Sequence, residues 1–138
     1  MMSSSRYTVA IHILTLLAWM KDEALTSEFI AGSVNTNPVV IRRILALLRE
    51  AKFVSSRSGP GGGWSLARPA ESITLRDVYW AIEEGALFSM HTNEPNPKCP
   101  VGRDIQEILR GHFSDARQAL AQQLAKTTIS DLIQSIDA

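Results

Sequence analysis

The chain has 138 residues, 45% apolar and 20% charged, a composition typical of a globular protein with one domain and a small additional element. Its longest apolar stretch, Val9 to Met20, is too short for a membrane span and is preceded by too little positive charge for a secretion signal. One cysteine, Cys99, excludes an internal disulfide framework, so we expect a cytoplasmic protein.

The formal net charge of zero conceals an asymmetry along the chain. Residues 1–68 contain eight Lys or Arg and four Asp or Glu, whereas residues 69–138 contain six and ten. A polyanion such as nucleic acid is therefore expected to bind the first half. The excess is modest, and by itself it does not identify the partner.

Two helices are predicted first, over residues 6–20 and 27–32. The apolar residues of the first cover more than one stripe, which is typical of a helix packed on two sides, and His12 among them is expected to be a hydrogen-bonded core residue. Residues 21–25 are interpreted as a polar turn. Thr26 is suited to cap the second helix, and Gly32 is expected at its end.

A third helix is predicted from Pro38 to about Ala51, with Asn37 as its N-cap, since proline at the first helical position loses no hydrogen bond. Apolar residues at helical spacing define its buried face: Ile41, Ile44, Leu45 and Leu48. The opposite face carries Val39, Arg42, Arg43 and Ala46.

A β-hairpin follows, with strands at 53–57 and 64–66 joined by a glycine-rich turn at 58–63. Thr74 and Asp77 have the spacing of a capping box and start a fourth helix that runs to about Glu84.

The last third of the chain is predicted to be a loop, a long helix and a short helix. Residues 87–100 contain three prolines and no periodicity. After Pro100 the apolar positions keep helical spacing to Leu124, which corresponds to roughly 35 Å of helix. A domain this small cannot surround so long a helix. A short helix is expected at 129–136.

Three helices followed by a hairpin indicate a mainly α fold with a small β-hairpin: a winged helix-turn-helix plus a long C-terminal dimerisation helix. This interpretation divides the chain into a DNA-binding domain at 1–84, a loop at 85–100, and a dimerisation helix with a short terminal helix at 101–138.

In this motif the third helix enters the major groove, and the hairpin lies on the backbone or in the adjacent minor groove. Each signal is weak alone, but their order is specific. The candidate DNA-binding residues are Thr36, Asn37, Val39, Arg42 and Arg43 on the helix, and Arg57, Ser58, Gly59, Pro60 and Gly61 at the hairpin tip.

The segment 53–66, which contains Gly-Pro-Gly-Gly-Gly, resembles the wing signature of the Rrf2 family of bacterial regulators, which includes IscR-, NsrR- and CymR-type proteins. The resemblance continues through 73–78, the Cys99-Pro100 helix start and 128–132, and so covers nearly the whole chain. It implies a homodimer in which the long helix crosses to the partner, and a palindromic operator.

Family members that sense through an iron–sulfur cluster carry three cysteines before the long helix, and Cys99 resembles the last of them. Clusters normally take four protein ligands, mostly thiolates, and this chain has one cysteine. No cluster and no other cofactor is therefore expected. Cys99 precedes Pro100 beside Lys98, where a helix N-terminus and an ammonium favour the thiolate. It is therefore a candidate redox sensor, and the alternative is an inert thiol.

Other functions are less well supported. His91, Glu94 and Asn96 share the loop without metal-ligand spacing, so no metal site is expected. An effector pocket lined by Tyr79, Trp80 or Phe88 is an alternative that the sequence allows but does not demand. No phosphate loop, dinucleotide fingerprint or nucleophile elbow indicates an enzyme. The sequence thus predicts a DNA-binding transcriptional regulator that acts as a repressor, and the alternative is a winged helix used only for protein contacts.

Overall fold

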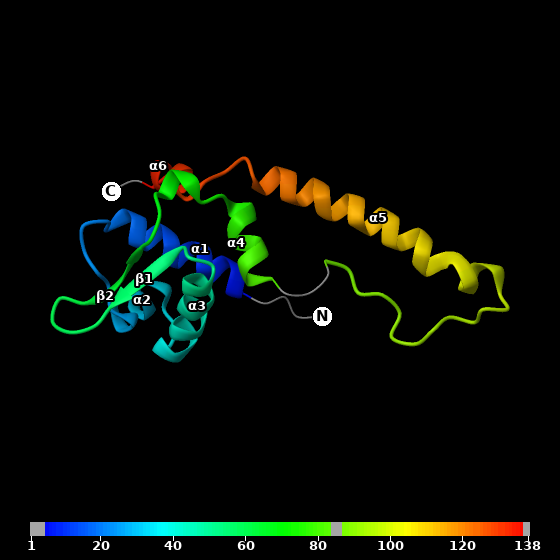
Figure 1. Ribbon diagram of the computed structural model, residues 1–138, viewed down its shortest axis with the longest axis horizontal. Helices are drawn as coiled ribbons and strands as arrows, with labels where there is room; N and C mark the ends of the chain where they lie inside the picture. Colours follow the sequence, from blue (N-terminus) through cyan, green and yellow to red (C-terminus); the bar gives the residue numbers. More distant parts are fainter. Residues whose placement is uncertain (1–4, 84–86, 137–138) are drawn as a thin grey trace. The chain divides into compact units, whose positions relative to one another are not determined.

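The computed structural model describes residues 5–83 and 87–136. These residues form two compact units, one made of residues 5–83 and 124–136 and the other of residues 87–123. The first contains most of the helices and a β-hairpin, and the second contains most of one long helix (Figure 1).

The core of the first unit is built around α1 (Arg6–Trp19), α2 (Ser27–Val34) and α3 (Pro38–Glu50). All three contribute fully buried side chains, among them Ile13, Leu14, Ile30, Ile41 and Leu45. His12 does not belong to this core, contrary to expectation. Its side chain is exposed and lies 2.9 Å from the Ser33 hydroxyl.

The sequence analysis predicted that α2 ends at Gly32, and this prediction is wrong. The helix continues to Val34 and ends at Asn35, which adopts the left-handed conformation (φ 64°, ψ 50°) and donates its N–H to the carbonyl of Ala31. Asparagine tolerates this conformation because its short polar side chain can bond locally. Thr26 caps the start of the helix as predicted, accepting the N–H of Phe29.

Strands β1 (Val54–Arg57) and β2 (Gly63–Leu66) form the predicted antiparallel hairpin. Leu25, which the sequence places in a polar turn, is buried and pairs with Trp64: each N–H donates to the other's carbonyl, at 2.9 and 2.8 Å. One residue from before α2 is thereby bonded to the wing.

Helix α4 (Leu75–Ile82) begins with the predicted capping box: the Thr74 and Asp77 side chains each accept the other's backbone N–H at 3.0 Å. The helix ends at Ile82, and the predicted end at Glu84 lies outside the described residues. A short 3-10 helix, η1 (Ala70–Ser72), precedes it and was not predicted.

Helix α6 (Ile129–Gln134) packs within the first unit, whereas the sequence grouped it with the long helix. Ile129 is fully buried, and its N–H donates to the carbonyl of Ile73 at 2.9 Å. Thr128 pairs with Thr74 in a single β-bridge and forms a second capping box with Asp131. These contacts between distant segments place the boundary near Gln123.

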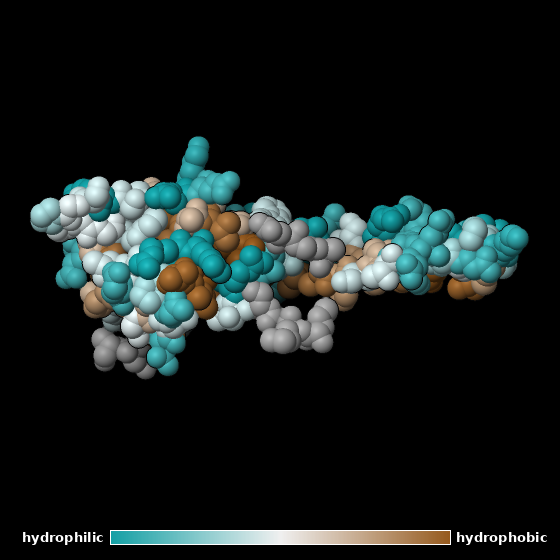
Figure 2. Space-filling model, turned by 90° about the horizontal axis from the view of Figure 1, so that it is seen from below, coloured by the Kyte–Doolittle hydropathy of each residue, from teal (hydrophilic) through white to brown (hydrophobic). Residues whose placement is uncertain are grey.

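The second unit consists of residues 87–99, in which no helix or strand forms, and of α5 (Pro100–Leu124) up to Gln123. The 25 residues of α5 correspond to about 37 Å of helix, and none is buried. Exposed apolar side chains lie beside hydrophilic ones over this part of the chain (Figure 2). No helix in the described ranges is long and apolar enough to cross a membrane.

Candidate nucleic-acid interface

The start of α3 is fixed by a side-chain cap. The Asn37 Oδ1 atom accepts the backbone N–H groups of Val39 at 2.8 Å and Val40 at 3.3 Å, and Pro38 occupies the first helical turn. The side-chain oxygen of Asn37 is therefore engaged in the helix cap. Its amide nitrogen remains a donor on an exposed residue at the end of the helix that was predicted to read DNA.

The two faces of α3 are those that the periodicity predicted. Ile41, Ile44, Leu45 and Leu48 are all buried. On the opposite face Val39, Arg42, Arg43 and Ala46 are exposed. The buried face anchors the helix, so the exposed face is presented on a rigid element.

The adjacent arginines of α3 differ in their contacts. Arg42 Nη1 lies 3.4 Å from Glu28 Oε1 on α2, in a solvent-exposed ion pair. The Arg43 side chain makes no hydrogen bond or ion pair with any other described residue. An exposed pair contributes less than about 1 kcal/mol, so both guanidinium groups are available to phosphate. Arg43 is available without breaking a contact.

The tip of the hairpin is shaped by glycines in conformations that L side chains rarely adopt. Gly59 and Gly61 have φ of 87° and 74°, and the Gly62 N–H donates to the Gly59 carbonyl at 2.9 Å. Arg57 Nη2 donates to the carbonyl of Gly61 at 3.3 Å, and Ser58 and Pro60 are exposed beside it. The tip therefore presents polar backbone and one guanidinium group to solvent.

Sequence reasoning missed Arg49. Its guanidinium carbon lies 5.3 Å from the centre of the Trp64 ring on β2, and its Nη1 donates to the Ser56 hydroxyl on β1 at 3.4 Å. It connects α3 to the wing and adds a cation between them. The available signal was its position seven residues after Arg42, two helical turns along the same face.

The remaining predicted residues are placed as follows. Thr36 is half-buried in the turn before α3, and its N–H donates to the Ala31 carbonyl. Cys99 is exposed and directly precedes α5, where its carbonyl accepts the N–H of Arg103 at 2.8 Å. Phe88 packs against Phe113, with ring centroids 4.5 Å apart.

Tyr79 and Trp80 each contact another side chain of the described chain. Tyr79 stacks edge-on against Tyr7, with ring centroids 5.4 Å apart. Trp80 is exposed, with the Arg76 guanidinium carbon 4.9 Å from its ring centre.

A family model described as an iron-dependent transcriptional regulator, Rrf2, matches residues 3–135. YwnA of Bacillus subtilis (strain 168), a proposed HTH-type transcriptional regulator, is 45% identical over 133 residues, which cover 96% of this chain and 97% of YwnA. The chain belongs to the Rrf2 family.

A second relative of this Rrf2 protein is the HTH-type transcriptional regulator IscR of Cereibacter sphaeroides, 32% identical over 95 residues, or 69% of this chain and 61% of IscR. A crystal structure of a proposed DNA-binding protein superposes with a TM-score of 0.76 at 42% identity, covering 94% of this chain and 99% of the other. CymR of B. subtilis, with a TM-score of 0.74 at 22% identity and 99% of each chain covered, shares the fold. The Rrf2 protein is thus a transcriptional regulator with a DNA-binding fold, and not an enzyme.

The family description names iron, but the residues of this chain do not fit an iron site. Cys99 is the only thiol in the whole sequence. Within the described ranges no three His, Cys, Asp or Glu side chains are grouped so that they could hold a metal ion. An iron–sulfur cluster normally takes four protein ligands, mostly thiolates, which one cysteine per chain does not supply.

Proposed function

We propose that this Rrf2 protein is a sequence-specific DNA-binding repressor that acts as a homodimer on a palindromic operator without an iron–sulfur cluster. The observation that carries the proposal is a series of exposed arginines on consecutive elements of one compact unit. Arg42 and Arg43 lie on α3, Arg57 lies on the wing, and Arg49 of α3 contacts the wing.

In the proposed complex α3 enters the major groove with its N-terminal end toward the bases. The Asn37 amide nitrogen donates to a base edge, and Arg42 and Arg43 bind phosphate oxygens or a guanine edge. The tip of the hairpin lies on the sugar–phosphate backbone, where Gly59 and Gly61 permit close approach and Arg57 supplies positive charge.

The homodimer is supported by the apolar surface of α5. Seven apolar residues recur along it at helical spacing, and none is buried in the single chain: Val101, Ile105, Ile108, Phe113, Ala116, Leu120 and Leu124. In a two-fold symmetric dimer, the α5 helix of the second copy covers this apolar surface. A two-fold dimer binds two half-sites related by the same symmetry, which requires a palindromic operator. Such a dimer represses by occluding the promoter.

The experiment is a fluorescence anisotropy titration of reduced protein against a duplex from its own upstream region, at several salt concentrations. A shuffled duplex of equal composition is the control. We expect tight binding to the upstream duplex, with log affinity falling steeply against log salt because phosphate contacts release counterions. Binding that is absent or independent of salt would instead favour the winged helix that contacts only proteins.

Thiol sensing through Cys99 is the regulatory part of this proposal, supported by the exposure of the thiol at the start of α5. Peroxide is expected to change operator affinity in the wild type and not in Cys99→Ser. An affinity that peroxide leaves unchanged, or changes equally in both proteins, contradicts this role.

A further inference from the structure

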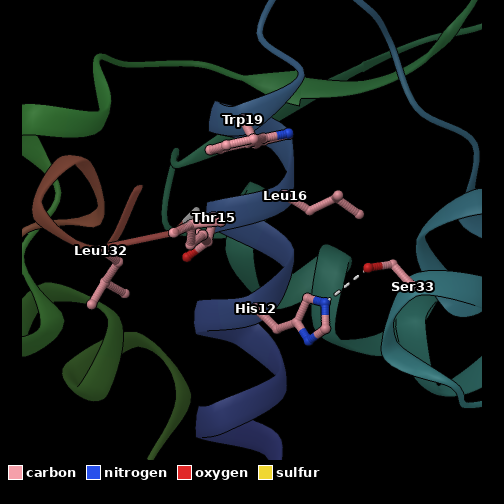
Figure 3. Close-up of a pocket in the computed structure, with 7 residues that line it drawn as sticks. His12, Thr15, Leu16, Trp19, Ser33 and Leu132 are labelled. Carbon is pink, nitrogen blue, oxygen red and sulfur yellow. Dashed lines mark hydrogen bonds between the residues drawn. The ribbon is translucent and has the colours of Figure 1, made fainter. Parts of the chain in front are cut away.

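A hydrophobic groove of about 530 Å³ opens between α1, α2 and α6, within the winged-helix unit, and its lining includes none of the candidate DNA-binding residues (Figure 3). Its walls include Leu16 and Trp19 from α1, Ser33 from α2 and Leu132 from α6. Sites for small molecules have volumes of roughly 300–1,000 Å³, so the groove has the capacity of a ligand site.

The apolar part of the groove offers a surface for an aromatic ring. Trp19 is 43% exposed, whereas the core-facing side chains of the same helix are buried. Leu16 and Leu132 are half-buried on either side of the groove. An indole ring prefers an offset or edge-on partner, and contact with one adds to the free energy gained from burying apolar area.

The polar part of the groove is one hydrogen-bonded pair. His12 Nε2 lies 2.9 Å from the Ser33 hydroxyl oxygen, and Figure 3 shows the two side chains directed toward each other from α1 and α2. The Thr15 hydroxyl donates to the Ile11 carbonyl at 2.7 Å, so it offers a ligand an acceptor only.

The charge of the lining restricts the ligand further. Among the described residues that line the groove, none is Lys, Arg, Asp or Glu. A fully charged ligand would lose hydration without gaining an oppositely charged partner, which is costly in an apolar environment. A neutral ligand with one hydroxyl or carbonyl group meets no such penalty.

We propose that this groove is a binding site for a neutral aromatic molecule that carries one hydrogen-bonding group. The ring packs against Trp19 between Leu16 and Leu132, and the hydroxyl or carbonyl group bonds to His12 and Ser33. The two polar side chains fix the orientation of the ligand, and the apolar walls supply most of the affinity.

The test is a titration of the ¹⁵N-labelled full chain with 2-naphthol, followed by NMR. The indole N–H signal of Trp19 and the amide signal of Ser33 are expected to shift saturably, while the indole signals of Trp64 and Trp80 stay unchanged. Naphthalene, which lacks the hydroxyl, and 2-naphthoate, which is charged, are expected to bind at least tenfold more weakly.

Substitutions separate the polar anchor from the apolar walls. His12→Leu should weaken 2-naphthol binding at least tenfold and change naphthalene binding less than twofold. The matched control is His112→Leu, the same change at an exposed histidine of α5, which should have no effect.

Three results would overturn the proposal: no saturable shift at Trp19 and Ser33, equal losses in the two histidine variants, or equal affinity for 2-naphthoate. Groove signals that change when the free protein is diluted would likewise overturn it, in favour of contact with a second copy. No DNA is present in this titration, so its outcome is independent of the function proposed above.

Discussion

Among single residues, Arg43 has the clearest expected contribution to DNA binding. It lies beside Arg42 on the exposed face of α3, but it has no ion pair with any described residue to give up. Both positions follow directly from the helical spacing of the sequence. The difference between them does not, because it depends on Glu28 in another helix.

Arg43→Ala is expected to weaken operator binding about tenfold, or about 1.4 kcal/mol. It should also reduce the slope of log affinity against log salt by about 0.9, because one phosphate contact is lost. Anisotropy titrations at four or more salt concentrations measure both quantities. Arg103→Ala on α5 is the control and should change neither. An unaltered slope in Arg43→Ala would exclude the phosphate contact.

The pKa of the Tyr7 side chain is strongly raised. Burial, and then the neighbouring Tyr79 and Glu83, raise the pKa of Tyr7 to about 12, and its hydroxyl donates to the Leu75 carbonyl at 2.6 Å. In the unfolded chain the pKa of tyrosine is about 10. The folded state therefore holds the proton more tightly. This contribution to stability is complete below about pH 10 and is lost as the pH rises toward 12.

Tyr7→Phe is expected to lower the free energy of unfolding at pH 8 by about 1 kcal/mol, through loss of the hydrogen bond. Between pH 10 and 12 the wild type should lose stability more steeply than the variant. Urea denaturation monitored by circular dichroism at pH 8, 10 and 11.5 provides the comparison. Parallel pH profiles for the two proteins would show that Tyr7 is not the group that titrates.

For whole elements, α3 is the part of the fold that the sequence determines most fully. Three local signals agree there: an asparagine cap, a proline at the first position and an apolar period of three to four residues. The predicted end of α2 was wrong. Gly32 and Asn35 both suit a helix end, and only the structure shows that Asn35 adopts the left-handed conformation.

Elements that depend on distant partners were beyond sequence reasoning. Leu25 joins the wing only because Trp64 lies beside it, and Arg49 becomes part of the candidate interface through Trp64 and Ser56. The outward residues of α3 and the tip of the hairpin were identified from local pattern. The contacts that connect helix and wing are non-local and leave no periodic signal.

Two glycines of the wing provide a matched test of this pairing. A Cβ atom on Gly63 (φ 139°) would lie 2.7 Å from the Leu25 carbonyl oxygen, whereas one on Gly59 (φ 87°) would meet open space. Gly59→Ala should cost only the backbone strain, about 1 kcal/mol. Gly63→Ala should cost at least about 2 kcal/mol, because strain is added to the loss of pairing with Leu25.

Thermal or urea unfolding of both variants measures the difference. Amide hydrogen exchange at Leu25 and Trp64 should accelerate in Gly63→Ala alone. Equal stabilities for the two variants would show that the close approach of Leu25 does not constrain the wing.

At the level of the whole molecule, the proposed assembly depends on α5. Ile108 lies on its apolar face and is 55% exposed in the single chain. Ile108→Asp is expected to shift the protein from dimer to monomer, because an unpaired carboxylate would be buried in the interface. Operator affinity should fall with it, since two half-sites are no longer bound together.

Light scattering coupled to size-exclusion chromatography, run over a tenfold range of concentration, reports the mass. Gln118→Asp places the same charge on the opposite face of α5 and should leave the dimer intact. If Ile108→Asp remained dimeric, this face of α5 would not be the interface.

The insertion of Ile129 into the core has a consequence for how the chain folds. The residue is fully buried and bonded to Ile73, yet α5 and the preceding loop separate it from Ile82, the end of α4. Closing a loop of roughly 45 residues adds only a few kcal/mol of entropic cost, but contacts between such distant segments slow folding. During synthesis, the core of the winged helix therefore stays incomplete until α5 has been made. A product truncated before Ile129 is therefore expected to lack a finished core.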